Sequence, residues 1–157
     1  MQLARLLLAL LPLFPLFASA AEHCSGRVLK VADGDTLELE CEGRPMRVRL
    51  DQIDAPEFRQ AHGPRARNAL QELVGGRQVR LEIQGRDAYD RPLATVWRDG
   101  LDVNREMLRR GHAWVYRRGL HDPSLLADEA HARERRLGLW SAPDPRPPWQ
   151  FRAAARH

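Results

Sequence analysis

Hydrophobic and polar residues alternate along the first part of the chain with the two-residue period of half-buried strands. Two such runs, residues 27–31 and 36–40, lie on either side of the dipeptide Asp33-Gly34, and a third run covers residues 46–50. Alternation on both sides of an Asp-Gly pair is typical of a β-hairpin. The pattern therefore predicts a meander of three strands.

A helical period replaces the alternation after Gly63-Pro64. Apolar residues then recur three and four positions apart as far as Val74, and Gly75-Gly76 follows them. A proline in the first turn and a glycine just past the last turn are the usual boundaries of a helix. We therefore expect one helix between these two dipeptides.

Two more alternating runs follow at residues 79–83 and 93–97, and the polar residues 84–92 join them. Five strands with one helix after the third strand is the order of an OB-type barrel. Residues 103–109 and 123–136 then predict two further helices. We expect an α+β fold that is mainly β, a five-stranded OB-fold barrel with three α-helices.

The first twenty residues have the three-part pattern of a secretory signal peptide. Arg5 precedes an apolar run, Leu6 to Phe17, and small residues follow up to Ala20. A transmembrane anchor is the competing interpretation, but the run is shorter than the ~20 residues of a spanning helix and two prolines interrupt it. We expect cleavage after Ala20 and a secreted or periplasmic protein that is free of the membrane.

The other end of the chain also differs from the middle. From Pro143 onward the sequence is rich in proline and arginine, which favours an extended segment that lies on the domain or leaves it. The expected organisation is therefore a signal peptide at 1–20, one OB-fold domain at 21–142 and a tail at 143–157. One domain with one core is also what the length predicts, and a monomer is expected.

Cys24 and Cys41 are the only cysteines. In an exported protein an even pair favours a disulfide. The two cysteines flank the predicted hairpin, so strand pairing would bring them opposite each other. The alternative is two separate buried thiols.

The charge of the chain contributes less than its motifs. Without residues 1–20 there are 24 basic and 21 acidic residues, a net charge of +3, and Lys30 is the only lysine. The guanidinium of arginine suits phosphate, which fits a polyanionic partner. A GC-rich genome explains the arginine bias equally well, and +3 alone does not establish nucleic-acid binding.

Four carboxylates gather in the predicted meander and the loop after it, at Asp33, Asp35, Asp54 and Glu57. Hard oxygen ligands of this kind are what Ca²⁺ or Mg²⁺ requires. A structural role is the alternative, because Asp-Gly is a turn dipeptide and Asp before Ala-Pro ends a strand. For Asp33 the turn role is favoured.

Two arginines stand near these acids without a decisive signal of their own. Arg49 is on the third strand and shares a face with Arg47, and an arbitrary strand arginine is usually a solvated charge. Arg91 is in a polar loop, where a surface turn is the plain interpretation. Spacing alone leaves a catalytic role for either residue weak.

Three motifs taken together are far more specific: VADGDT at 31–36, RLDQIDAPE at 49–57 and DAYDR at 87–91. A single Asp-Gly-Asp-Thr would be a weak match, but the joint pattern in this order resembles the thermonuclease, or micrococcal nuclease, family. The similarity continues toward the C-terminus through DVN at 102–104, GHA at 111–113 and GLW at 138–140, and it covers roughly residues 27–140.

The resemblance implies an OB-fold barrel with a Ca²⁺ site. Carried over by position, Asp35 and Asp54 would give carboxylate ligands and Ala55 its backbone carbonyl. The family often has Thr at the position of Ala55, so a hydroxyl is missing here. It usually has Gly at the position of Asp90, which puts an additional carboxylate beside Arg91.

The resemblance also places Arg49, Glu57 and Arg91 at the chemical centre. Glu57 would act as general base toward water, and both arginines would donate hydrogen bonds to phosphate oxygens in the transition state. The implied activity is hydrolysis of DNA and RNA to 3′-phosphate ends, with little sequence preference because phosphate is read and not base edges. Tyr89 and Tyr116 are candidates for stacking on bases.

Two other classes of function remain open from the sequence. One is a non-catalytic OB-fold module that binds single-stranded nucleic acid or a protein. The other is a periplasmic factor whose basic surface and proline-rich tail dock a partner. A degenerate member of the family would be expected to lack catalytic residues, so the enzyme is favoured here by the presence of Asp35, Arg49, Asp54, Glu57 and Arg91.

Overall fold

The computed structural model describes residues 22–156, and the predicted signal peptide lies outside them. The meander forms as expected from β1 (Glu22–Asp33), β2 (Thr36–Cys41) and β3 (Arg44–Leu50). Asp33 pairs with Thr36 across the first turn, and all three strands run antiparallel to their neighbours. Alternate apolar residues of β2 and β3 are buried in the core, as the sequence indicated. In β1 the register shifts between Val28 and Lys30, so Val28 and Val31 are both buried and Leu29 is 51% exposed.

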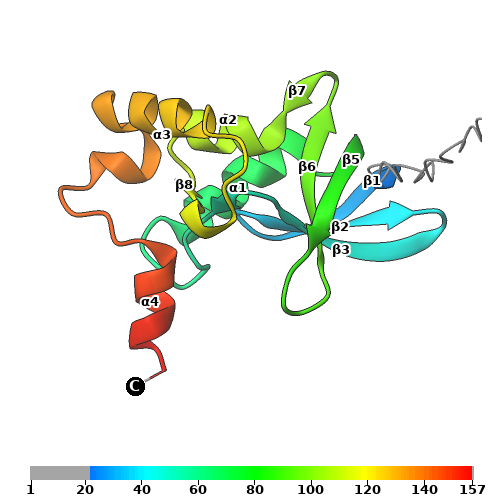
Figure 1. The fold of residues 1–157 in the computed structure, drawn as a ribbon, viewed down its shortest axis with the longest axis horizontal. Coiled ribbons are helices and arrows are strands. Elements are labelled where there is room, and N and C mark those ends of the chain that lie inside the picture. Colours follow the sequence, from blue (N-terminus) through cyan, green and yellow to red (C-terminus); the bar gives the residue numbers. More distant parts are fainter. Residues whose placement is uncertain (1–21, 157) are drawn as a thin grey trace, which may run out of the picture.

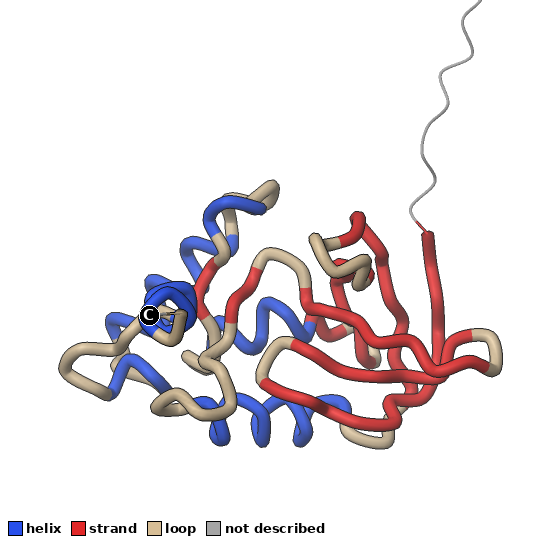
Figure 2. Tube along the Cα trace, turned by 90° about the horizontal axis from the view of Figure 1, so that it is seen from below, coloured by secondary structure: helices blue, strands red, loops and turns tan. Residues whose placement is uncertain are grey.

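The sheet closes on itself to form a barrel (Figures 1 and 2). β5 (Gln78–Arg86) pairs with β1, and β6 (Pro92–Arg98) pairs with β5, both antiparallel. β6 then returns to β3 in a short parallel pairing, in which Arg49 lies opposite Leu93. The predicted five-stranded barrel is therefore confirmed.

Three short strands add to this barrel. β7 (Leu101–Asp102) extends the sheet beside β6. β4 (Ile53–Asp54) pairs with β8 (Trp114–Val115) in a separate two-stranded sheet, with Asp54 opposite Trp114. This small sheet fixes the segment that follows β3 to the helical end of the molecule.

The three main helices lie along one face and at one end of the barrel (Figure 2). They are α1 (Gly63–Val74), α2 (Val103–Arg109) and α3 (Leu125–Glu134). The apolar stripe of α1 is buried, and α2 begins at Asp102, whose carboxylate accepts a hydrogen bond from the backbone N–H of Arg105. Two 3₁₀ turns, η1 (Arg117–Gly119) and η2 (Gly138–Ser141), complete this end.

The tail differs from the sequence expectation. Part of the segment expected to be extended is a fourth helix, α4 (Pro148–Ala154). Proline is compatible with the first turn of a helix because its fixed φ suits that position and its missing N–H is not needed there. The prolines of the tail end at Pro148, so the residues after it are free to continue the helix.

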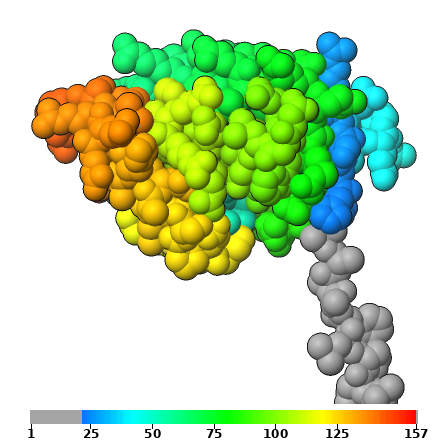
Figure 3. All heavy atoms as spheres, turned by 90° about the horizontal axis from the view of Figure 1, so that it is seen from above, coloured from blue at the N-terminus to red at the C-terminus, as the bar shows by residue number. Residues whose placement is uncertain are grey.

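The predicted disulfide is confirmed. Cys24 near the start of β1 and Cys41 at the end of β2 are bonded, with their Cα atoms 6.1 Å apart. β1 and the β2–β3 hairpin lie at the end of the molecule opposite α3 and the residues after it (Figure 3). No helix within residues 22–156 is long and apolar enough to span a bilayer.

Candidate active site

One hollow of about 610 Å³ collects residues from all three sequence motifs. It opens between the β1–β2 turn, β3, the loop after β4 and the β5–β6 loop. Asp54 is fully buried beside it. Seven of the eight residues predicted for catalysis, metal binding and base stacking line its wall: Asp35, Arg49, Ala55, Glu57, Tyr89, Arg91 and Tyr116.

The two predicted metal ligands lie close together and share one guanidinium. Nη1 of Arg49 is 2.8 Å from Oδ1 of Asp35, and Nη2 is 3.0 Å from Oδ1 of Asp54. The other oxygen of Asp35 accepts a hydrogen bond from the backbone N–H of Ala55 at 2.8 Å. Burial, together with the charges of Asp33 and Asp54, raises the pKa of Asp35 although Arg49 opposes the shift.

The segment after β3 is held by contacts that come from far along the chain. The side-chain amide of Asn104 donates to the carbonyls of Asp51 and Ala94, and its oxygen accepts from the backbone N–H of Val96. Gln52 adopts the left-handed conformation, and its side-chain oxygen accepts from the backbone N–H of two residues just before α3. These bonds fix the path that places Asp54 and Glu57 beside Asp35.

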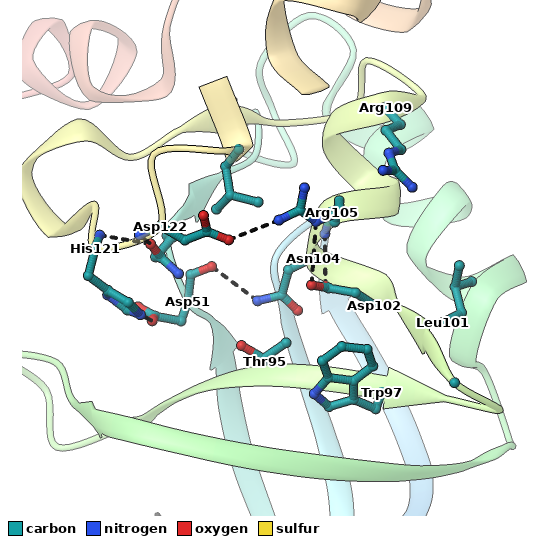
Figure 4. A pocket seen from close by; sticks show the side chains of 13 residues that line it. Asp51, Thr95, Trp97, Leu101, Asp102, Asn104, Arg105, Arg109, His121 and Asp122 are labelled. Carbon is teal, nitrogen blue, oxygen red and sulfur yellow. Dashed lines mark hydrogen bonds and ion pairs between the residues drawn. The ribbon is translucent and has the colours of Figure 1, made fainter. Parts of the chain in front are cut away.

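A second hollow of about 520 Å³ lies behind this segment, beside α2 (Figure 4). Asn104 reaches across it to Asp51, and Arg105 reaches toward Asp102 and Asp122. None of the residues predicted for catalysis or metal binding lines it. Its hydrogen bonds connect α2 to the Asp51 end of the active-site segment, so this hollow serves the scaffold of the site.

Glu57 stands at the rim of the active-site hollow. Its backbone carbonyl accepts a hydrogen bond from the N–H of Gln60, and its own N–H donates to the side chain of Gln60. The Glu57 side chain is 38% exposed and reaches the hollow. The position suits a group that must meet water and substrate.

Arg91 is held within its own loop. Its Nε and Nη2 donate to Oδ2 of Asp87 at 2.8 and 2.7 Å, while the other oxygen of Asp87 accepts from the backbone N–H groups of Tyr89 and Arg91. Burial alone would raise the pKa of Asp87, but these hydrogen bonds outweigh it and hold the pKa below its usual value. The loop is therefore organised around Asp87.

Asp90 keeps the loop shape that glycine would give. Its φ is +60°, in the left-handed region that aspartate enters more readily than most residues. Its carboxylate is 3.4 Å from Nη1 of Arg86 and is 86% exposed. The additional carboxylate of Asp90 pairs with Arg86, whereas Arg91 pairs with Asp87.

The sequence did not predict one side chain that enters the site, Arg152 of α4. Its Nη2 is 2.8 Å from Oδ2 of Asp54, and its Nη1 is 3.1 Å from Oδ1 of Asp54 and 2.7 Å from Oε1 of Glu57. Hydrogen bonds to Asp54 and Glu57 raise the pKa of Arg152 above its usual range despite burial. The signal in the sequence was a helix start, Pro148 followed by residues that tolerate a helix.

The donors of the site fit a hard cation such as Ca²⁺. Asp35 and Asp54 are 3% and 0% exposed, and both attract a guanidinium. With the carbonyl of Ala55 they would supply the oxygen ligands that the sequence predicted. Within the described residues no three Asp, Glu, His or Cys side chains gather as a metal site, so substrate and water would complete the coordination.

Known proteins similar to this chain agree with this geometry. Residues 47–142 match the family model described as "Staphylococcal nuclease homologue". A protein of Haemophilus influenzae named "Uncharacterized endonuclease" is 40% identical over 149 residues, which cover 94% of this chain and 84% of the relative. "Protein ParB" of Escherichia coli is 42% identical, covering 81% of this chain and 78% of its own length.

A further relative carries the name of an activity. "Micrococcal nuclease" of Shigella flexneri is 36% identical over 143 residues, with 84% of this chain and 82% of the relative covered. Together with the matched family model, these relatives favour the enzyme over a non-catalytic binding module. The chain belongs to the staphylococcal nuclease family, and it is a nuclease that acts on nucleic acid.

Proposed function

We propose that this nuclease is calcium-dependent and that it hydrolyses the phosphodiester backbone of both DNA and RNA. The observation that carries the proposal is the meeting of Arg49, Glu57 and Arg91 around one hollow, with Asp35 and Asp54 at its base. Oxygen ligands from these two aspartates and from Ala55 would hold Ca²⁺. When bound, the cation supplies charge neutralisation at the phosphate.

Glu57 is proposed as the general base. Its exposed carboxylate takes a proton from a water molecule as the water oxygen bonds to phosphorus. The bond from phosphorus to the 5′-oxygen breaks, and that oxygen leaves with the electron pair and takes a proton from solvent. The products carry a 3′-phosphate and a 5′-hydroxyl end.

Arg49 and Arg91 are proposed to stabilise the charge that builds on the phosphate oxygens. Their side chains are 19% and 25% exposed and line the hollow from different sides, one from β3 and the other from the β5–β6 loop. A guanidinium offers paired N–H donors to phosphate, which an ammonium does not. Each guanidinium is already oriented by carboxylates before substrate enters.

Tyr89 and Tyr116 are proposed to stack on the bases beside the scissile bond. Tyr89 is 78% exposed, and the guanidinium of Arg91 lies 5.6 Å from the centre of its ring. Tyr116 is 37% exposed on another wall of the hollow. Because any base offers a stacking face and the chemistry reads phosphate, little sequence preference follows.

The protein is proposed to work outside the cytoplasm, either secreted or in the periplasm. The disulfide between Cys24 and Cys41 supports this, since such bonds persist in oxidising compartments. The pattern of residues 1–20 supports it independently. We propose cleavage after Ala20, a single OB-fold domain over 21–142 and a separate tail.

The function is tested by incubating the mature protein with plasmid DNA and with RNA, in CaCl₂ and in chelator. We expect both substrates to be cut with calcium and neither with chelator, and Glu57→Gln to lose activity while it keeps its fold. Product ends that accept polymerase extension only after phosphatase treatment would identify 3′-phosphates. Cutting in chelator would refute the calcium requirement, and no cutting under any condition would refute the activity.

A further inference from the structure

The helix α4 brings a cationic side chain into the acid cluster of the active site. Arg152 donates to both carboxylate oxygens of Asp54 and to Oε1 of Glu57. Oδ1 of Asp54 also accepts from Arg49. Each oxygen of Asp54 therefore has a guanidinium partner when α4 is docked.

These are the oxygens that the proposed reaction needs. Asp54 is a proposed calcium ligand, and a ligand oxygen must lie within about 2.6 Å of the cation, which leaves no room for the Arg152 contacts at the same place. Glu57 is the proposed base. A carboxylate that accepts a hydrogen bond from a guanidinium is a weaker base toward a water molecule. The docked Arg152 and the working site thus compete for the same atoms.

The position of Arg152 follows from how α4 is anchored. Asp54 lies opposite Trp114 in the pairing of β4 with β8. The ring of Trp149 meets the ring of Trp114 edge-on, with the ring centres 5.6 Å apart. Trp114 therefore contacts α4 through its side chain and pairs with Asp54 through its backbone. Residues three apart on a helix share a face, and Arg152 is three residues after Trp149. Docking Trp149 therefore delivers Arg152 to Asp54.

The anchor is small enough to be released. α4 has seven residues, and a helix of this length is marginal without tertiary contacts. It meets the body of the molecule at β4 and β8, where Arg152 binds Asp54 and Trp149 lies against Trp114. Phe151 lines a hollow of about 440 Å³ together with the loop around Gln60 and η2. Besides the Arg152 bonds, this segment is held by Trp149 on Trp114 and by a 2.6 Å bond from Gln60 to the carbonyl of Arg146, just before α4.

We propose that α4 is an autoinhibitory latch, in which Arg152 occupies the acid cluster and Ca²⁺ binding displaces it. The inference rests on the proposed calcium dependence. A closed latch lowers the fraction of molecules that are ready to bind the cation, and the apparent dissociation constant rises by that factor. Calcium would then bind and open the site in one linked step, because a ligand shifts the balance toward the form it binds better.

The test is a calcium titration of the mature protein by isothermal calorimetry, with CaCl₂ as the only ligand. We expect Arg152→Ala to bind calcium about tenfold more tightly than the wild type. Arg156→Ala is the matched control, because Arg156 lines the same hollow and its loss removes the same charge from the same segment, whereas only Arg152 binds Asp54 and Glu57. Its affinity is expected to change less than twofold.

A second variant opens the latch and keeps the arginine. Trp149→Ala removes the contact with Trp114 and should tighten calcium binding in the same direction as Arg152→Ala. In the wild type, calcium should also change tryptophan fluorescence as Trp149 leaves Trp114, and Trp149→Phe should remove that change. Thermal melting without calcium checks that all variants are folded.

The possible results separate the latch from the function on which it rests. Calcium binding by neither the wild type nor Arg152→Ala would overturn both. Equal calcium affinity in the two proteins would overturn the latch alone. If Arg152→Ala also cut more slowly at saturating calcium, with its affinity unchanged, Arg152 would be a substrate contact. Tighter binding in both Arg152→Ala and Trp149→Ala supports the latch.

Discussion

The two arginines of the proposed active site are held in opposite ways. Arg49 lies on a barrel strand between Asp35 and Asp54, and the segment that carries Asp54 is fixed by Asn104, 53 residues from the Asp51 carbonyl that it binds. Arg91 lies in a hairpin loop and is held by Asp87, four residues earlier. The position of Arg49 thus depends on the completed fold, whereas that of Arg91 is determined by its own loop.

The largest effect on activity is expected when either arginine is replaced by lysine. Arg49→Lys and Arg91→Lys should each slow hydrolysis by on the order of 10² to 10³, because the paired donors to the phosphate are lost. Arg49→Lys should also lower the melting temperature, since one buried carboxylate loses its partner. Arg91→Lys should not. Rates near that of the wild type for Arg91→Lys would remove this residue from the mechanism, and Arg86→Lys at the end of β5 is the control.

The long-range support of Arg49 is tested through Asn104. Asn104→Ala removes three buried hydrogen bonds, each worth about 1 kcal/mol. We expect the free energy of unfolding in urea to fall by about 3 kcal/mol. Asn68→Ala is the control, because Asn68 is an exposed residue of α1 and its replacement should change stability by less than about 0.5 kcal/mol. A small loss for Asn104→Ala would contradict the importance of these bonds.

The local support of Arg91 is tested through Asp87. Asp87→Asn removes the charge that orients the guanidinium but keeps an oxygen for the backbone N–H groups. We expect activity to fall about tenfold at unchanged unfolding free energy, since misplacing a catalytic donor costs rate without loosening the core. Asp90→Asn should retain the wild-type rate because its carboxylate faces Arg86. Equal loss in both variants would indicate a general charge effect.

Lowering the pH should reduce the free energy of unfolding through a contact between distant segments of the chain. His112 contacts His62 at 2.9 Å, next to the start of α1. Burial, followed by the charges of His62 and Arg110, lowers the pKa of His112 from 6.5 to about 4. Between these values the unfolded chain binds more protons than the folded chain. The stabilisation is therefore complete above about pH 6.5 and is lost as the pH falls toward 4.

Urea unfolding at pH 7 and pH 5 measures this contribution. The wild type should lose about 1 kcal/mol more than His112→Gln between the two values, a figure reduced for the partial exposure of the ring. Carboxylates elsewhere titrate alike in both proteins and cancel in the difference. An identical pH dependence of the two proteins would exclude His112 as the source.

Most of the barrel was predictable because each strand carries its own alternating pattern. Leu37 and Leu39 are buried at the positions that this pattern indicated, and the glycine and proline signals placed α1 at the observed residues. The strands and α1 depend on short-range patterns, which a single sequence displays directly. Which side chains would share a hollow was implied by the resemblance of the three motifs to the nuclease family.

The remainder depends on contacts that have no local pattern. Nothing around Arg152 indicates that it will reach Asp54, which is 98 residues earlier. Proline-rich composition favoured an extended tail, and the docking of Trp149 on Trp114 stabilises a helix there instead. The pairing of Asp90 with Arg86, away from Arg91, depends on the left-handed turn at Asp90, which is a property of the folded loop.

The parallel pairing of β3 with β6 has a consequence for when the enzyme becomes active. It is the contact that closes the barrel, and it sets Arg49 opposite Leu93, two residues after Arg91. Contacts between distant segments tend to form after local ones during folding. A chain that has formed its hairpins but not this pairing therefore holds its two arginines on separate pieces. On the proposed mechanism, cutting activity therefore requires the closed barrel, which brings both arginines to one hollow.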